Sequence, residues 1–305
     1  MSVKGFSREE FPELRYLRIE GNVPRLPVNL EALPRLAYYE GPIFKGFKLP
    51  TSLKYLRVIA QSNGNECATS EESNPIQPDQ SSSLQELDLS GVENLPILSE
   101  GIRSSLKILN AYGWDVTEFP AQFCQLSSLN KLDMWGWESL KGLPKSFSNL
   151  TSLTHLNLSS CPKLRGLCSK FGDLRGLRFL DLGECKMLTH LPASFGQLTA
   201  LKYLNLSSCR RLKVLPKNFS ELIALECLDL WCCSRLKTLP ENFEKLPALK
   251  HLVLSGCKSF KEFPLNLGEL RSLQELHLID PYGNCPWLKE LPSSLKDKRS
   301  LKILR

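Results

Sequence analysis

A leucine opens the same short motif, LxxLxL, at intervals of 24 residues through the second half of the chain. These opening leucines are Leu129, Leu153, Leu177, Leu201, Leu225, Leu249 and Leu273. A fixed period of this length is the sequence signature of a repeat array in which each repeat forms one structural unit. One such unit is too short to bury its own apolar face, so neighbouring units must stack and share a continuous core.

Within each repeat the spacing of the apolar residues changes along the sequence. In the repeat that opens at Leu201, leucines alternate with Tyr203 and Asn205, which predicts a short strand whose leucines face the core. Further apolar residues over 212–222 return the chain along the outer side, where Pro216 removes a backbone donor and favours a loose turn or a short helix. The sequence therefore predicts an α/β solenoid, the leucine-rich-repeat horseshoe, with a concave parallel β-sheet and a convex side made mostly of loops and short helices.

The array accounts for the whole chain, so we predict one solenoid domain over residues 1–305. The repeats are regular over 129–272, and less regular copies open at Leu14, Leu36, Leu53, Leu84 and Leu106. Residues 62–83 are polar and nearly free of large apolar side chains, which predicts a disordered or mobile insert. The last repeat, 301–305, is incomplete, and we expect the chain to be a fragment or a truncated relative of a longer protein.

Five cysteines fall at the ninth position of consecutive repeats, counted from the opening leucine. They are Cys161, Cys185, Cys209, Cys233 and Cys257. In arrays of this type the ninth position turns toward the core and holds Asn or Cys. A zinc site would need closer pairs such as CxxC, and side chains that stand parallel at the strand spacing hold their Cβ atoms too far apart for a typical disulfide. We therefore predict a ladder of buried thiols, with Cys232, beside Cys233, as the solvent-facing member of that pair.

The full unit reads LxxLxLxxCxxLxxLPxxFxxLxx, as in LRFLDLGECKMLTHLPASFGQLTA from residue 177. It resembles the repeat domain of plant intracellular disease-resistance receptors of the nucleotide-binding leucine-rich-repeat class, most strongly over 106–292. The resemblance implies a cytoplasmic protein of plant defence whose partner is a pathogen effector, a guarded host protein or a neighbouring receptor domain. The sequence has no GxxxxGK[ST] phosphate loop, so we do not expect the nucleotide switch of those receptors here.

Candidate partner-binding residues lie on the strand faces that the leucines leave open, which form the concave face of the predicted sheet. They are Trp135, His155, Phe179, Asp181, Tyr203, Asn205, Asp229 and Trp231. Acidic and amide side chains alternate at the fifth position of the strands, with aromatic side chains beside them, and exposed Trp and Tyr are common in binding hot spots. The alternative interpretation is a solvated strand face without a partner.

Other classes of function find little support in the sequence. The four histidines have no nucleophile at motif spacing, so we expect neither enzymatic activity nor a cofactor. The net charge of +7 is modest for a nucleic-acid-binding protein, so we do not expect nucleic acid as a partner. No run of about 18 apolar residues occurs, which predicts a chain without a membrane span.

The sequence favours a non-catalytic module that binds protein, and the resemblance implies a role in plant defence recognition or in the autoinhibition of a receptor. The alternative is a cytosolic scaffold or a substrate-selecting subunit of a phosphatase or ubiquitin ligase, because the same fold can serve either role. An extracellular receptor ectodomain is a third alternative.

Overall fold

A computed structural model describes most of the chain in two compact units. The described residues are 11–20, 30–43, 49–59, 83–92, 98, 100–260, 262, 265–280, 283, 285–288, 295 and 301–304. The first unit is Met1–Trp114 with Gln122–Asp133, and the second is Asp115–Ala121 with Met134–Arg305. The predicted insert at 62–83 lies outside the described residues except for Ser83. One continuous solenoid over 1–305 stays a prediction.

The described residues contain thirteen short strands. In the first unit they are β1 (Tyr16–Arg18), β2 (Tyr38–Gly41), β3 (Tyr55–Val58), β4 (Glu86–Asp88), β5 (Ile108–Asn110) and β6 (Lys131–Asp133). In the second unit they are β7 (His155–Asn157), β8 (Phe179–Asp181), β9 (Tyr203–Asn205), β10 (Cys227–Asp229), β11 (His251–Val253), β12 (Glu275–His277) and β13 (Lys302–Leu304). Within each unit, successive strands pair in parallel and in chain order.

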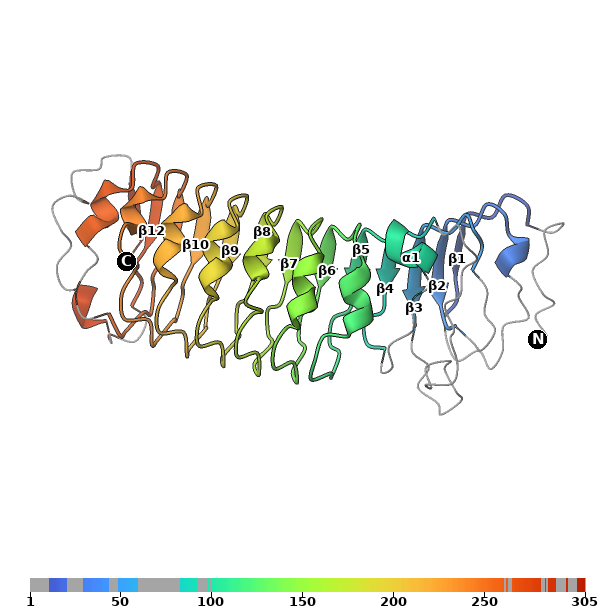
Figure 1. The fold of residues 1–305 in the computed structure, drawn as a ribbon, viewed down its shortest axis with the longest axis horizontal. Coiled ribbons are helices and arrows are strands. Elements are labelled where there is room, and N and C mark those ends of the chain that lie inside the picture. Colours follow the sequence, from blue (N-terminus) through green and yellow to red (C-terminus); the bar gives the residue numbers. More distant parts are fainter. Residues whose placement is uncertain are drawn as a thin grey trace. The chain divides into compact units, whose positions relative to one another are not determined.

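Helical turns connect many of the strands, as the return segment of the repeat predicts. They are η1 (Leu30–Ala32), α1 (Glu100–Ser105), η2 (Ala121–Gln125), η3 (Lys145–Asn149), η4 (Phe171–Asp173), η5 (Ala193–Gln197), η6 (Lys217–Glu221), η7 (Phe243–Lys245), η8 (Leu265–Glu269) and η9 (Pro286–Leu288). All but α1 are 3₁₀ helices, which suit runs of only three to five residues. In Figure 1 the coiled ribbons of the second unit stand in front of its strands.

The core of the second unit consists of columns of identical residues. The strand register places Leu204 beside Leu180 on one side and Leu228 on the other, and each of these leucines is almost completely buried. A second column contains the buried phenylalanines Phe147, Phe171, Phe195, Phe219 and Phe243. Their rings stack with centroids 6.1–6.3 Å apart. Because every repeat supplies the same shapes, each leucine and phenylalanine of these columns packs beside its own equivalent in the neighbouring repeat.

The cysteine ladder adds hydrogen bonds to this packing, and the predicted burial is confirmed. All five ladder residues are fully buried free thiols. The Sγ of Cys209 donates to the carbonyl oxygen of Leu182 in the preceding repeat at 3.2 Å, and the Sγ of Cys233 donates to that of Leu206 at 3.1 Å. Burial raises the pKa of the Cys233 thiol to about 12, so it stays protonated and remains a donor at neutral pH.

A tight turn joins each strand to its ladder cysteine. After β10 the N–H of Cys233 donates to the carbonyl of Leu230 at 3.1 Å, and Cys232, the third residue of this turn, has a φ of 54°. A positive φ at that place is the mark of a type II turn and favours glycine. The equivalent Ser208 and Gly256 have φ values of 57° and 71°. The turn explains why Cys232 and Cys233 point to different surroundings: Cys232 is half-buried and Cys233 lies in the core.

Replacing Cys209 by arginine should prevent folding or reduce the free energy of unfolding by several kcal/mol, because a charge would enter a site with no room and no counter-ion. Cys209→Ser keeps a donor of similar size and should fold. The control is Cys227→Arg on the half-exposed side of β10, which should leave the denaturation midpoint nearly unchanged. Equal urea midpoints for the two arginine variants would contradict the assigned role of the ladder.

Candidate protein-binding surface

The strands of the second unit turn one face away from the leucine core, and we call this the open face. Counted from the opening leucine of each repeat, the third-position side chains on this face form an aromatic row. The row consists of His155, Phe179 and Tyr203, which the strand register aligns. The rings of Phe179 and Tyr203 stack with centroids 4.7 Å apart and planes 3° from parallel. His155 stacks on Phe179 at 6.0 Å. His155 is exposed and the other two side chains are half-buried, so ring edges are available to a partner.

The fifth-position side chains form a second row, the amide–carboxylate row of Asn157, Asp181, Asn205 and Asp229. Each uses its Oδ1 to accept the backbone N–H two residues later, for example Ser207 N on Asn205 at 2.8 Å and Trp231 N on Asp229 at 2.7 Å. This local bond fixes the turn at the end of the strand. The row therefore has a structural role that the sequence analysis did not anticipate.

Alternation of amide and acid along this row has a physical cause. The amide Nδ2 of Asn205 donates to the Oδ1 of Asp181 at 2.9 Å across the strands. If two carboxylates stood side by side in this row, their like charges would repel each other. Neither carboxylate could donate a hydrogen bond to the other. Burial raises the pKa of Asp229, and the N–H of Trp231 partly offsets this.

The two tryptophans of the candidate set lie elsewhere on the open face. Trp135 and Trp231 stand at the seventh position of their repeats, two residues beyond the strand ends, and are 48 % and 42 % exposed. The register places Cys227, not Trp231, beside Tyr203. Phe179 and Tyr203 therefore share one row, whereas Trp231 stands at a different position of the repeat.

Charged side chains of the later repeats form ion pairs between neighbouring repeats. Glu226 lies between Lys202 at 3.0 Å and Lys250 at 2.7 Å, and their ammonium groups lower its pKa to about 2. The carboxylate of Glu275 lies 3.3 Å from Nδ1 of His251 and 3.4 Å from Nζ of Lys302. The charge on Lys302 is the main cause of the lowered pKa of Glu275.

The first unit has an aromatic row of its own that the sequence analysis missed. Its members are Tyr16, Tyr38 and Tyr55 on β1 to β3. Their rings stack with centroids 4.4 Å and 4.1 Å apart. All three tyrosines occupy the third position after Leu14, Leu36 and Leu53, so extending the column analysis to the irregular repeats would have found them.

A line of charges runs beside these tyrosines. Glu40, which is only 4 % exposed, has Arg57 at 3.2 Å on one side and Arg18 at 3.7 Å on the other. Arg57 also reaches Asp88 at 3.5 Å, and the hydroxyl of Tyr38 donates to Glu40 at 3.3 Å. Opposite charges on neighbouring strands thus compensate one another.

Comparison with known proteins supports the fold. Residues 165–305 match the model of a leucine-rich repeat region. A leucine-rich-repeat protein of Leptospira interrogans is 29 % identical with a TM-score of 0.54, over 72 % of this chain and 60 % of that one. The leucine-rich repeat domain of the type III effector XopL is 24 % identical with a TM-score of 0.58, over 65 % of this chain and 69 % of that one. No curated protein sequence matches the chain.

These findings confirm the predicted leucine-rich-repeat solenoid with its parallel sheet. The chain spans less than two thirds of the Leptospira protein that it resembles, since the match covers 60 % of that chain. Domains of this kind are typically non-catalytic and mediate contacts between proteins. In the parts of the chain that the structure describes, no helix has the length and apolar character needed to cross a bilayer.

Truncating Glu40 should lower the free energy of unfolding by about 1–2 kcal/mol, because its carboxylate joins two strands through Arg18 and Arg57. The loss stays moderate because both arginines are partly exposed and regain water. Glu20→Ala is the matched control: this glutamate also pairs with Arg18, at 2.7 Å, but is largely exposed. A urea titration of Glu40→Ala and Glu20→Ala giving equal losses would contradict this interpretation.

Glu226 should make stability sensitive to acid. Its pKa in the folded chain, about 2, lies below the ordinary value of 4.5, so its contribution is fully present above pH 4.5 and is lost as the pH falls toward 2. Glu226→Gln should therefore be less stable than the native chain at neutral pH, and the difference should vanish near pH 2. Denaturant midpoints measured across this pH range test the prediction, with Glu221→Gln as an exposed control. A difference that does not change with pH would contradict it.

Proposed function

Because the chain carries a leucine-rich-repeat solenoid, we propose that it is a non-catalytic module that binds a protein partner through the open face of β7 to β10. The observation that supports this most directly is the stacked pair of Phe179 and Tyr203, which presents apolar ring edges on the side of the sheet away from the core. Aromatic side chains in such places are the anchors that dominate the energy of many interfaces.

Rigidity of the surface strengthens the proposal. The rings of the aromatic row are held by stacking, and the side chains of the amide–carboxylate row are held by backbone N–H groups. A partner therefore orders few side chains when it binds, which reduces the entropic cost of association. A standard footprint of about 800 Å² on each partner would cover several neighbouring strands at about 4.8 Å spacing.

The finer proposal concerns the biological setting. The repeat signature, with Cys at the ninth position and LP further along, resembles that of plant intracellular disease-resistance receptors. On this basis the partner is a pathogen effector, a guarded host protein or a neighbouring receptor domain, and the module serves recognition or autoinhibition. The ten described cysteines are free thiols, which supports a reducing, cytoplasmic location.

Substitutions in the aromatic row test the proposal. Binders are selected against the folded chain from a displayed protein library, and their dissociation constants are measured by calorimetry. Tyr203→Ala and Phe179→Ala should each weaken binding by about 2 kcal/mol, roughly 30-fold. The same changes should lower the free energy of unfolding by only about 1 kcal/mol, the value of one ring stack.

The control is Ile223→Ala, which removes an apolar side chain that is 57 % exposed, more than either ring, from the segment that follows η6, outside the open face. Its affinity for the binders should equal that of the native chain. If Ile223→Ala abolishes binding while Tyr203→Ala and Phe179→Ala do not, the binding surface lies on the other side of the repeats.

A further inference from the structure

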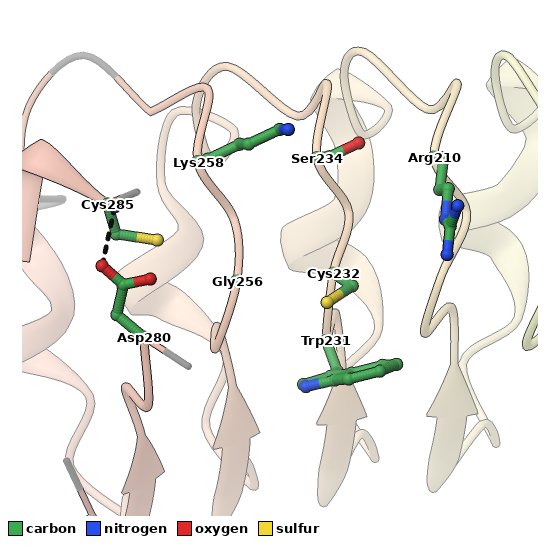
Figure 2. A pocket seen from close by; sticks show the side chains of 8 residues that line it. All are labelled: Arg210, Trp231, Cys232, Ser234, Gly256, Lys258, Asp280 and Cys285. Carbon is green, nitrogen blue, oxygen red and sulfur yellow. Dashed lines mark hydrogen bonds between the residues drawn. The ribbon is translucent and has the colours of Figure 1, made fainter. Parts of the chain in front are cut away.

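A small pocket opens beyond the ends of the strands β9 to β12, in the second unit. Its volume is about 210 Å³, and the residues that matter for its chemistry are Arg210, Trp231, Cys232, Ser234, Lys258 and Asp280 (Figure 2). These residues come from four successive repeats, so the pocket is made by stacking and exists in no single repeat.

Three of the lining residues occupy the same place in consecutive repeats. Arg210, Ser234 and Lys258 all stand at the tenth position, and the backbone N–H of each donates to the carbonyl two residues before it, at 2.8, 2.7 and 3.0 Å. The equivalent backbones set the three side chains in consecutive repeats, and all three line the pocket. A short serine between two long cations leaves a hollow with a cation on either side.

The floor of this hollow is closed by the neighbouring turns. Gly256, with a φ of 71°, lies so near that a Cβ built on it would be 2.8 Å from the Sγ of Cys232. The N–H of Cys232 donates to the carbonyl of Ser255 at 2.8 Å and fixes that turn. The thiol therefore lies at the base of the pocket, where any occupant would cover it.

Charge is unevenly distributed around the pocket. Asp280 accepts the N–H of Cys285 on its Oδ2 at 2.8 Å, and Figure 2 shows it beside Cys285, on the side away from Arg210. The ammonium group of Lys258 points toward Ser234 in the same view. Two cations and a hydroxyl thus line the pocket on the side toward Arg210, while the carboxylate of Asp280 lies on the other side and already accepts a hydrogen bond.

We infer that this pocket holds an acidic side chain, aspartate or glutamate, of the protein that docks on the open face. This rests on the proposed function and identifies one chemical requirement of the partner. Arg210 and Lys258 supply opposite charge and Ser234 supplies a neutral donor for the carboxylate oxygens.

The pocket is continuous with the open face. Trp231 lines it and is 42 % exposed, while its backbone N–H is bonded to Asp229 of the amide–carboxylate row. A partner that covers the aromatic row can therefore extend one acidic residue past Trp231 into the hollow.

Alkylation of Cys232 by iodoacetamide, followed by mass spectrometry, tests the inference without the natural partner. The probe is a capped hexaglutamate peptide, and capped hexaglutamine is the neutral control. Hexaglutamate should slow the alkylation of Cys232, and added salt should remove the protection because screening weakens exposed ion pairs. Cys227, the half-buried first residue of β10, is the internal reference and should react at an unchanged rate.

Charge reversal identifies the groups responsible. Arg210→Glu and Lys258→Glu should each raise the hexaglutamate concentration needed for half-protection by about tenfold. Lys186→Glu makes the same change at the tenth position of an earlier repeat that does not line the pocket, and it should have no effect. Protection by hexaglutamine, protection that survives both pocket substitutions, or protection by inorganic phosphate but not by hexaglutamate would overturn the inference.

The two proposals can fail separately. If hexaglutamate fails to protect Cys232 while Tyr203→Ala still weakens the selected binders, the acidic subsite is wrong and the open face remains the binding surface. If hexaglutamate protects but Tyr203→Ala and Phe179→Ala leave every binder unaffected, the pocket binds acidic groups and the aromatic row is not the docking surface.

Discussion

Each regular repeat places every residue beside its own equivalent in the next repeat, because the strands pair in one register at a period of 24 residues. Strands of three residues have no independent stability, so their persistence depends on this repetition. Leucine packs on leucine, phenylalanine stacks on phenylalanine, and each ladder thiol donates to a carbonyl of the preceding repeat. The conformational entropy lost when one repeat becomes ordered is thus offset by its contacts with the repeats on either side.

The same register determines what the surface can be. A side chain that faces away from the core becomes part of a row, and the chemistry of the row changes only as the residue at one position changes from repeat to repeat. At the third position the row passes from His155 and the Phe179–Tyr203 stack through Cys227 to His251 and Glu275, and the strand register places Lys302 beside Glu275. An extended partner lying across the strands would meet aromatic contacts first and charged contacts later.

The period predicted the strands, the inward leucines and the buried thiols, because these follow from one repeat alone. Contacts between side chains of different repeats were harder to predict. The bond from Asn205 to Asp181 and the bond from Asp229 to the N–H of Trp231 depend on the geometry of the turn, which composition does not reveal. The tyrosine stack of the first unit escaped notice because its repeats are irregularly spaced. The pocket near Cys232 combines four repeats and has no motif in any one of them.

The residue at the eighth position of the regular repeats has a positive φ, and this has a consequence for how such a surface can evolve. The eighth position holds Gly136, Ser160, Glu184, Ser208, Cys232 and Gly256 within this one chain, all at positive φ. A side chain there costs about 1 kcal/mol of backbone strain, whereas glycine costs a similar amount through the entropy of the unfolded chain. The two costs nearly cancel, so a hydroxyl, thiol or carboxylate side chain can stand here as well as glycine, except where a Cβ would meet a neighbouring turn, as at Gly256 beside the Sγ of Cys232. Because the residue at this position lines the pocket in the repeat of Cys232, drift at this site can produce new binding chemistry on an unchanged scaffold.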